Sequence, residues 1–206
     1  MQIRDDDVLL IIDVQNDFCS GGALAVNDGD AVVPVVNRLI ERFDHVVLTQ
    51  DWHPPGHSSF ATSHPGSAPF ESMMMPYGQQ TLWPDHCVQG TSGAAFHPRL
   101  VTDRAGLVIR KGVRSAIDSY SAFHENDRRT PTGLAGYLRE RGLQRIFLAG
   151  LATDYCVYYS AVDARRLGFD AVLVEAGCRA IDLAGSLDAA WTAMAAAGVQ
   201  RVSDLG

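Results

Sequence analysis

Short, uninterrupted runs of apolar residues recur along the chain, and segments with helical spacing separate most of them. The first run, residues 8–12, ends at the carboxylate of Asp13. Such a run is typical of a strand that is buried on both faces, as in a parallel sheet covered by helices. We expect six strands, at residues 7–13, 45–50, 106–110, 146–149, 170–175 and 199–202.

Apolar residues also recur at helical intervals between these runs. We expect helices from a cap at Asp28 or Asp30 to about Phe43, at 132–141, from the fourth strand to about Gly168, and at 186–196. Strands that alternate with helices predict an α/β fold with three layers: a six-stranded, mainly parallel sheet of Rossmann-like topology with helices on both faces. One composition throughout and the absence of internal repeats indicate a single domain over 1–206.

Residues 54–104 lack this periodicity and are rich in proline, glycine, serine and histidine. A connection of this length inside a domain is usually functional, because ordering it has an entropic cost. We therefore interpret residues 54–104 as a long loop that builds part of a site.

The charge balance argues against two classes of partner. The chain has 17 basic and 24 acidic residues, and no segment concentrates the basic ones. This pattern predicts neither nucleic acid nor a membrane as partner. The first residues, MQIRDDD, do not resemble a signal peptide. Four widely spaced cysteines do not form a disulfide framework, so we expect a cytoplasmic protein.

Four polar side chains stand where predicted strands end. Asp13 follows the first strand, Asp51 the second and Lys111 the third, and Cys156 comes just after the fourth. Ligands of open α/β sheets bind outside the carboxyl ends of the strands. Any one of these residues could be structural, as a cap, a surface lysine or a buried thiol. Four such side chains at successive strand ends predict that they share one crevice.

Each of three side chains in this crevice suits a step of acyl chemistry. Cys156 would be the nucleophile, and a position at the start of a helix would favour its thiolate. Asp13 could accept the thiol proton and return it to a leaving amine. Lys111 would balance the charge, and backbone N–H groups before Cys156 could stabilise an oxyanion.

A second set of residues suits a metal ion. Asp51 and His53 are two positions apart in extended chain, so both side chains point to the same side. His86, in the long loop, is the third candidate ligand. Two histidines and a carboxylate suit zinc, iron or manganese. The remaining histidines of this region, His57, His64 and His97, are expected to be structural or exposed.

Aromatic residues border the predicted crevice as well. Phe18 and Trp83 lie in two loops next to it, and a flat aromatic substrate could bind between them. Ordinary packing of the loops is the alternative interpretation.

Five segments together resemble the nicotinamidase family of the isochorismatase-like cysteine hydrolases: IIDVQNDFCSGGALAV, TQDWHPPGHSSFA, LWPDHCVQGTSGAAFHP, VIRKG and FLAGLATDYCV. The resemblance covers nearly the whole chain. It implies a six-stranded parallel sheet flanked by helices. It also implies hydrolysis of nicotinamide to nicotinate and ammonia through a thioester, in NAD salvage, with pyrazinamide as an adventitious substrate.

The resemblance also assigns roles to individual residues. It implies one divalent ion, zinc first, with iron or manganese as alternatives. The implied residues are the triad Asp13, Lys111 and Cys156, the oxyanion hole at the N–H groups of Ala152 and Cys156 after a cis Leu151–Ala152 peptide, the metal ligands Asp51, His53 and His86, and the ring-binding residues Phe18, Trp83 and Tyr120. His57 stays unassigned, and Tyr155 is expected to point away from the thiol.

Three other functions compete with this one. Another amide or ureido hydrolase of the same superfamily would share the triad. A non-haem iron oxygenase would use the two histidines and the carboxylate, but it would leave Cys156 and Lys111 without a role. A binding module without activity would leave the whole triad unused. The alanine-rich segment 186–196 and Tyr158-Tyr159 are candidates for a homo-oligomer interface.

Overall fold

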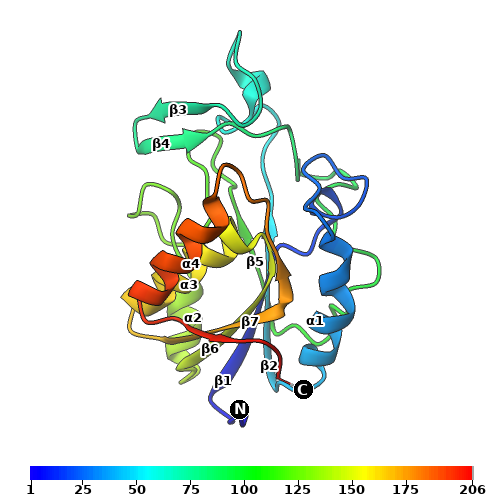
Figure 1. The fold of residues 1–206 in the computed structure, drawn as a ribbon, viewed down its shortest axis with the longest axis vertical. Coiled ribbons are helices and arrows are strands. Elements are labelled where there is room, and N and C mark those ends of the chain that lie inside the picture. Colours follow the sequence, from blue (N-terminus) through cyan, green and yellow to red (C-terminus); the bar gives the residue numbers. More distant parts are fainter. Residues whose placement is uncertain (206) are drawn as a thin grey trace.

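The computed structural model describes residues 1–205, and a six-stranded parallel sheet runs through them (Figure 1). The strand order is β5-β2-β1-β6-β7-β8, and every neighbouring pair is parallel. The strands are β1 (Asp7–Ile12), β2 (His45–Asp51), β5 (Leu107–Lys111), β6 (Arg145–Leu151), β7 (Asp170–Arg179) and β8 (Gln200–Val202). The predicted α/β fold with its six strands is confirmed.

Helices cover both faces of this sheet. Figure 1 shows α1 on one face and α2, α3 and α4 on the other. The helices are α1 (Val32–Ile40), α2 (Leu134–Glu140), α3 (Tyr158–Arg166) and α4 (Ser186–Ala196). Two are shorter than the sequence indicated: a 3-10 turn at Gly29–Ala31 precedes α1, and Gly133 with φ 99° precedes α2. None of the helices within residues 1–205 combines the length and apolarity needed to cross a bilayer.

The loop between β2 and β5 contains a small antiparallel hairpin that the sequence did not indicate. Its strands are β3 (Ser72–Met75) and β4 (Gly78–Thr81). Figure 1 shows the hairpin beyond the ends of the parallel strands. It was missed because its residues are mostly methionine, glutamine and glycine rather than the β-branched types that mark strands.

The two central strands, β1 and β6, are in unusually close contact at one glycine. Every residue of β1 is buried. Gly150 on β6 has φ 125°, and a Cβ there would lie 2.1 Å from the carbonyl oxygen of Ile12. Glycine is therefore required at this point. The strand order reverses between β1 and β6, and ligands of such sheets bind next to that point, outside the carboxyl ends.

Candidate active site

The four polar residues at the predicted strand ends do meet at one edge of the sheet. Asp51 and Lys111 are the last residues of β2 and β5, and they are register partners. Asp13 directly follows β1. Cys156 lies in a π-helical turn, Thr153–Val157, between β6 and α3. All four are buried, and ligand atoms of Asp13, Asp51 and Cys156 lie within 4.8 Å of one another.

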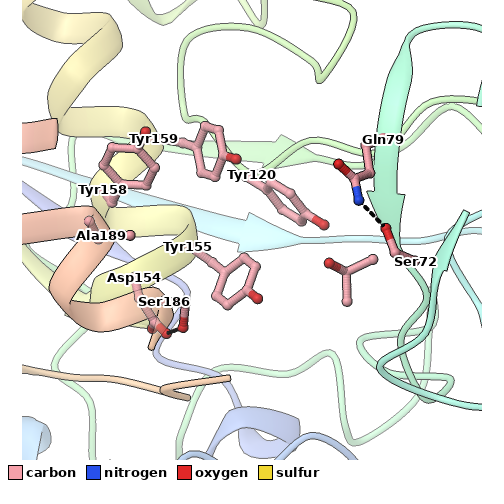
Figure 2. Close-up of a pocket in the computed structure, with 11 residues that line it drawn as sticks. Ser72, Gln79, Tyr120, Asp154, Tyr155, Tyr158, Tyr159, Ser186 and Ala189 are labelled. Atoms are coloured by element: carbon pink, nitrogen blue, oxygen red, sulfur yellow. Dashed lines mark hydrogen bonds between the residues drawn. The ribbon is translucent and has the colours of Figure 1, made fainter. Parts of the chain in front are cut away.

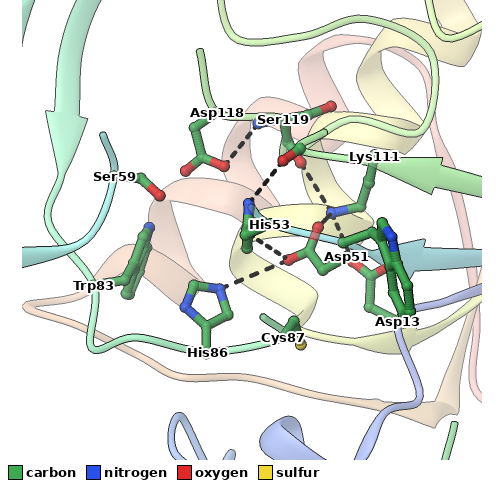
Figure 3. A network of polar contacts seen from close by, with 12 residues as sticks. Asp13, Asp51, His53, Ser59, Trp83, His86, Cys87, Lys111, Asp118 and Ser119 are labelled. Atoms are coloured by element: carbon green, nitrogen blue, oxygen red, sulfur yellow. Dashed lines mark hydrogen bonds and ion pairs between the residues drawn. The ribbon is translucent and has the colours of Figure 1, made fainter. Parts of the chain in front are cut away.

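Lys111 is the centre of this cluster. Its Nζ lies 2.8 Å from Oδ2 of Asp13, and it also forms an ion pair with Asp51. The same ammonium donates to the carbonyl of Ser119 at 2.9 Å and to Sγ of Cys156 at 3.4 Å. Burial alone would lower the pKa of Lys111, but the two carboxylates raise it well above its usual range. Lys111 therefore stays protonated, and Figure 3 shows its contacts with Asp51 and Ser119.

Asp13 is placed to exchange a proton with the thiol. Burial and the nearby Asp51 raise the pKa of Asp13, whereas Lys111 opposes the rise. Its backbone adopts φ 49°, a conformation that aspartate tolerates better than most residues. A carboxyl group whose pKa is raised can accept a proton and later donate it, as a general base and acid must.

The resting state of Cys156 differs from the prediction. Burial first, and then the charges of Asp13 and Asp51, raise the pKa of the Cys156 thiol well above its usual range, although Lys111 opposes this. Cys156 does lie at the start of a helix, because the π-helical turn Thr153–Val157 continues directly into α3, but burial still raises the pKa of its thiol. Cys156 is therefore a thiol at rest and needs a base.

The turn before Cys156 contains the cis peptide that the resemblance implied. The Leu151–Ala152 peptide is cis. The N–H groups of Tyr155 and Val157 each donate to the carbonyl of Ala152 at 3.1 Å, which folds the chain tightly around Cys156.

Asp51, His53 and His86 come together beside this cluster, and all are buried. Nδ1 of His53 lies 3.1 Å from the carbonyl of Gly112, and Nδ1 of His86 lies 2.8 Å from that of Pro84. Each Nδ1 can therefore carry the ring proton, which leaves Nε2 as a ligand atom.

The Nε2 atoms of these two histidines point to the same carboxylate oxygen. They lie 3.5 Å and 3.8 Å from Oδ2 of Asp51 (Figure 3). Nε2 of His53 is buried and has no hydrogen-bond partner among the described residues. The donor set, the fixed tautomers and this unpaired nitrogen all fit a transition metal ion.

His57 lies next to His53, at 4.5 Å between ring centroids, but both of its nitrogens are engaged. Nε2 lies 2.8 Å from the carbonyl of Arg114, so it is the donor. Nδ1 accepts from the backbone N–H of Ser59 at 3.1 Å and lies 2.8 Å from its hydroxyl. His57 thus supports the loop that carries Ser59.

A narrow pocket opens beside Cys156, and the three predicted ring-binding residues, Phe18, Trp83 and Tyr120, line it. The hydroxyl of Tyr120 accepts a hydrogen bond of 3.1 Å from Nε1 of Trp83. The prediction for Tyr155 is wrong: its side chain lines this pocket and contacts Trp83 edge-on, at 4.8 Å between ring centroids. The direction of a side chain in a π-helical turn could not be derived from the sequence.

Asp118, a buried carboxylate of the same pocket, was not indicated by the sequence. Its oxygens accept hydrogen bonds of 2.8 Å from the N–H of Ser119 and from the side chain of Gln80. No strand or helix includes Asp118, so no periodicity marked it. The further pocket residues that the sequence did not indicate are Leu24 and Ile181.

Comparisons with known proteins agree with this arrangement. The Isochorismatase domain family matches residues 7–204. Nicotinamidase from Acinetobacter baylyi is 51% identical over 203 residues, which cover 98% of this chain and 95% of that protein.

Two solved structures share the fold. PnC1 from L. infantum in complex with nicotinate superposes with a TM-score of 0.86 and 41% identity, and the match covers 98% of this chain and 95% of that one. Pyrazinamidase from Pyrococcus horikoshii in complex with zinc gives a TM-score of 0.77 and 33% identity, over 96% and 98% of the two chains. The protein described here therefore belongs to the isochorismatase family.

Proposed function

We propose that this protein is a nicotinamidase, which hydrolyses nicotinamide to nicotinate and ammonia and so serves NAD salvage. The observation that carries the proposal is the position of Lys111, whose Nζ lies 2.8 Å from Asp13 and 3.4 Å from the thiol of Cys156 beside an aromatic pocket. The nearly full-length similarity to the Acinetobacter baylyi nicotinamidase supports it.

In the first half of the reaction, Asp13 removes the proton of Cys156 and the thiolate attacks the carboxamide carbon. Lys111 keeps its proton and stabilises the negative charge. The N–H groups of Ala152 and Cys156 receive the oxyanion. Protonated Asp13 then donates its proton to the leaving amine, so ammonia departs and a thioester remains on Cys156.

In the second half, a water molecule replaces ammonia. Asp13, again ionised, takes a proton from this water as it attacks the thioester carbon. The carbon–sulfur bond breaks, nicotinate leaves, and the proton returns to the sulfur. The raised pKa of Asp13 suits both directions of transfer.

Asp51, His53 and His86 would hold one divalent ion, zinc first, with iron or manganese as alternatives. The zinc complex of the Pyrococcus horikoshii pyrazinamidase supports zinc. Such an ion would supply a Lewis acid for the ring nitrogen of the substrate. His57 is not part of this ligand set, because its two nitrogens already have partners.

Phe18, Trp83 and Tyr120 would bind the pyridine ring in the pocket beside Cys156. An edge or face of an aromatic side chain suits a flat heteroaromatic ring. Pyrazinamide has the same outline, so it should be accepted as an adventitious substrate.

We also propose a cytoplasmic location, which the four unpaired cysteines of the described chain support. A homo-oligomer would use the exposed part of α4 together with Tyr158 and Tyr159. The proposed substrate is a small molecule, and no nucleic acid or membrane partner is proposed.

The deciding experiment is an ammonia assay with nicotinamide on metal-replete protein. The protein should release ammonia and nicotinate in equal amounts, and Cys156→Ala should release none while binding as much metal as the wild type. Ammonia release by that variant would contradict the nucleophile. Faster release from small linear amides than from nicotinamide would favour another amide hydrolase, and oxygen consumption would favour an oxygenase.

A further inference from the structure

A second, larger pocket shares two residues with the catalytic one, and Figure 2 shows the side chains that line it. Its walls come from α3, α4 and the π-helical turn on one side and from β3 and β4 on the other. We call it the outer pocket, and its defining residues are Tyr120, Tyr155, Tyr158, Tyr159, Ser72 and Gln79. Two of these, Tyr120 and Tyr155, also line the catalytic pocket.

The two pockets differ strongly in free space. The outer pocket encloses about 420 Å³ and the catalytic pocket about 20 Å³. Phe18, Leu24 and Trp83 close the catalytic pocket elsewhere, and all three are buried. The larger free space of the outer pocket lies next to it, at the two shared tyrosines.

The two shared tyrosines are held differently. The ring of Tyr120 is fixed to the catalytic pocket, because its hydroxyl accepts hydrogen bonds from Nε1 of Trp83 at 3.1 Å and from Nε2 of Gln80 at 2.8 Å. The ring of Tyr155 packs edge-on against both neighbours, at 4.8 Å from Trp83 and 5.5 Å from Tyr120 between centroids. Both rings are half-buried and reach the outer pocket, but only Tyr120 bonds through its hydroxyl to Trp83 of the catalytic pocket.

Contacts across the outer pocket keep the Tyr155 ring in place. The phenol of Tyr155 interacts with the side chains of Thr81 on β4 and Ser186 on α4. Ser186 in turn donates to the carboxylate of Asp154, the residue before Tyr155 (Figure 2). The hairpin and α4 thus both contact Tyr155, whose side chain lines both pockets.

We propose that Tyr155 is a specificity-determining residue that separates the catalytic pocket from the outer pocket. It restricts turnover to carboxamides with a single unsubstituted aromatic ring. Without its ring the two pockets join, and aromatic primary carboxamides that carry a bulky ring substituent can place that substituent in the outer pocket. The inference rests on the proposed amide hydrolysis at Cys156.

The test compares nicotinamide with 5-phenyl- and 6-phenylnicotinamide as substrates of metal-replete wild type, Tyr155→Ala and Tyr158→Ala. The measured quantity is kcat/KM for ammonia release, expressed as the ratio of each phenyl compound to nicotinamide. In Tyr155→Ala this ratio should rise at least about tenfold for one or both phenyl compounds, the scale on which pocket size discriminates substrates. Tyr158 lines only the outer pocket, so Tyr158→Ala should not raise the ratio.

Two further variants keep the test decisive. Tyr155→Phe retains the ring and should keep the wild-type ratio. Tyr155→Leu replaces Tyr155→Ala if thermal unfolding shows that the alanine variant is not folded. An unchanged ratio for both phenyl compounds in a folded variant without the ring would overturn the role of Tyr155, and so would an equal rise in Tyr158→Ala. A wild type that releases no ammonia from nicotinamide would instead contradict the proposed function.

Discussion

The hydroxyl of Thr49 donates a hydrogen bond of 2.6 Å to Oδ1 of Asp13 and accepts one of 3.1 Å from the backbone N–H of Asp13. Thr49 lies on β2 and Asp13 directly after β1, so the hydroxyl links the two strand ends. Burial raises the pKa of Asp13, and the bond from Thr49 is one of the contacts that oppose the rise.

Thr49→Val should therefore raise the pKa of Asp13 further. Asp13 must be ionised to take the thiol proton, so the acidic limb of the kcat/KM profile should move to higher pH. Thr49→Ser retains the hydroxyl and should keep the limb in place. The measurement is ammonia release from nicotinamide as a function of pH, and an unmoved limb in Thr49→Val would contradict the role of Asp13 as the base.

Lys111→Met should both inactivate and destabilise the protein. It leaves the carboxylates of Asp13 and Asp51 buried without their cation. Removing one partner of a buried ion pair costs about 3–5 kcal/mol of unfolding free energy. Urea unfolding measures this loss. Arg110→Met is the neighbouring control, because Arg110 is exposed and its replacement should lower the unfolding free energy by less. A Lys111→Met protein as stable as the wild type would contradict the ion pairs.

Metal binding should depend on His86 and not on His57. His86→Ala removes a proposed ligand, whereas His57→Gln removes a side chain whose nitrogens already bond to Ser59 and Arg114. Elemental analysis after dialysis should find about one ion per chain in His57→Gln and much less in His86→Ala, because three ligands suffice for an open site. Loss of the ion in both variants would assign His57 to the ligand set.

Removing the ion with a chelator should mainly raise the KM for nicotinamide, since the ion is proposed to bind the ring nitrogen. Added zinc should restore the original KM. A benzamide lacks that ring nitrogen and provides the matched control, because its KM should change far less. An unchanged KM for nicotinamide in the metal-free protein would contradict contact between the ring and the ion.

Far from the site, Asp7 and Arg145 form an ion pair that makes stability depend on pH. Nε and Nη2 of Arg145 donate to the two oxygens of Asp7 at 2.7 Å and 2.6 Å, and the N–H of Arg4 donates at 2.7 Å. Burial would raise the pKa of Asp7, but these contacts together hold it below its ordinary value of 3.8.

A carboxyl whose pKa is lowered by folding stabilises the protein above its unfolded pKa, and this contribution disappears as the pH falls through the folded value. Asp7→Asn should lower the unfolding free energy at pH 7 by about 1.5–3 kcal/mol, the scale of charged hydrogen bonds. The difference from wild type should shrink below pH 3.8, the ordinary pKa. Thermal unfolding at pH 7 and pH 3 measures both, and the exposed Asp5→Asn is the control.

The parallel sheet could be predicted because its strands are continuous apolar runs. The site could be predicted because its reactive residues stand at the ends of those runs. Asp13, Asp51 and Lys111 meet as expected since strand ends of a parallel sheet share one edge. The hairpin β3–β4 gave no such signal, because it is only partly buried and poor in β-branched residues.

Other features could not be predicted because they depend on three-dimensional surroundings. The protonation state of Cys156 follows from its burial between two carboxylates, which no local pattern records. The direction of the Tyr155 ring follows from a π-helical turn in place of the expected start of an α-helix. Thr49 resembles any other strand threonine in the sequence, and only the folded chain brings it against Asp13.

Asp51 contacts Lys111 through one oxygen and faces His53 and His86 with the other. One carboxylate thus belongs to two functional groups at the same time. Changing the ligand set to suit another ion will also change the electrostatic field around the sulfur of Cys156, because the ligand set and this field both depend on the negative charge of Asp51. The same constraint applies in evolution, so changes in the metal ligands and changes in the catalytic residues should occur together.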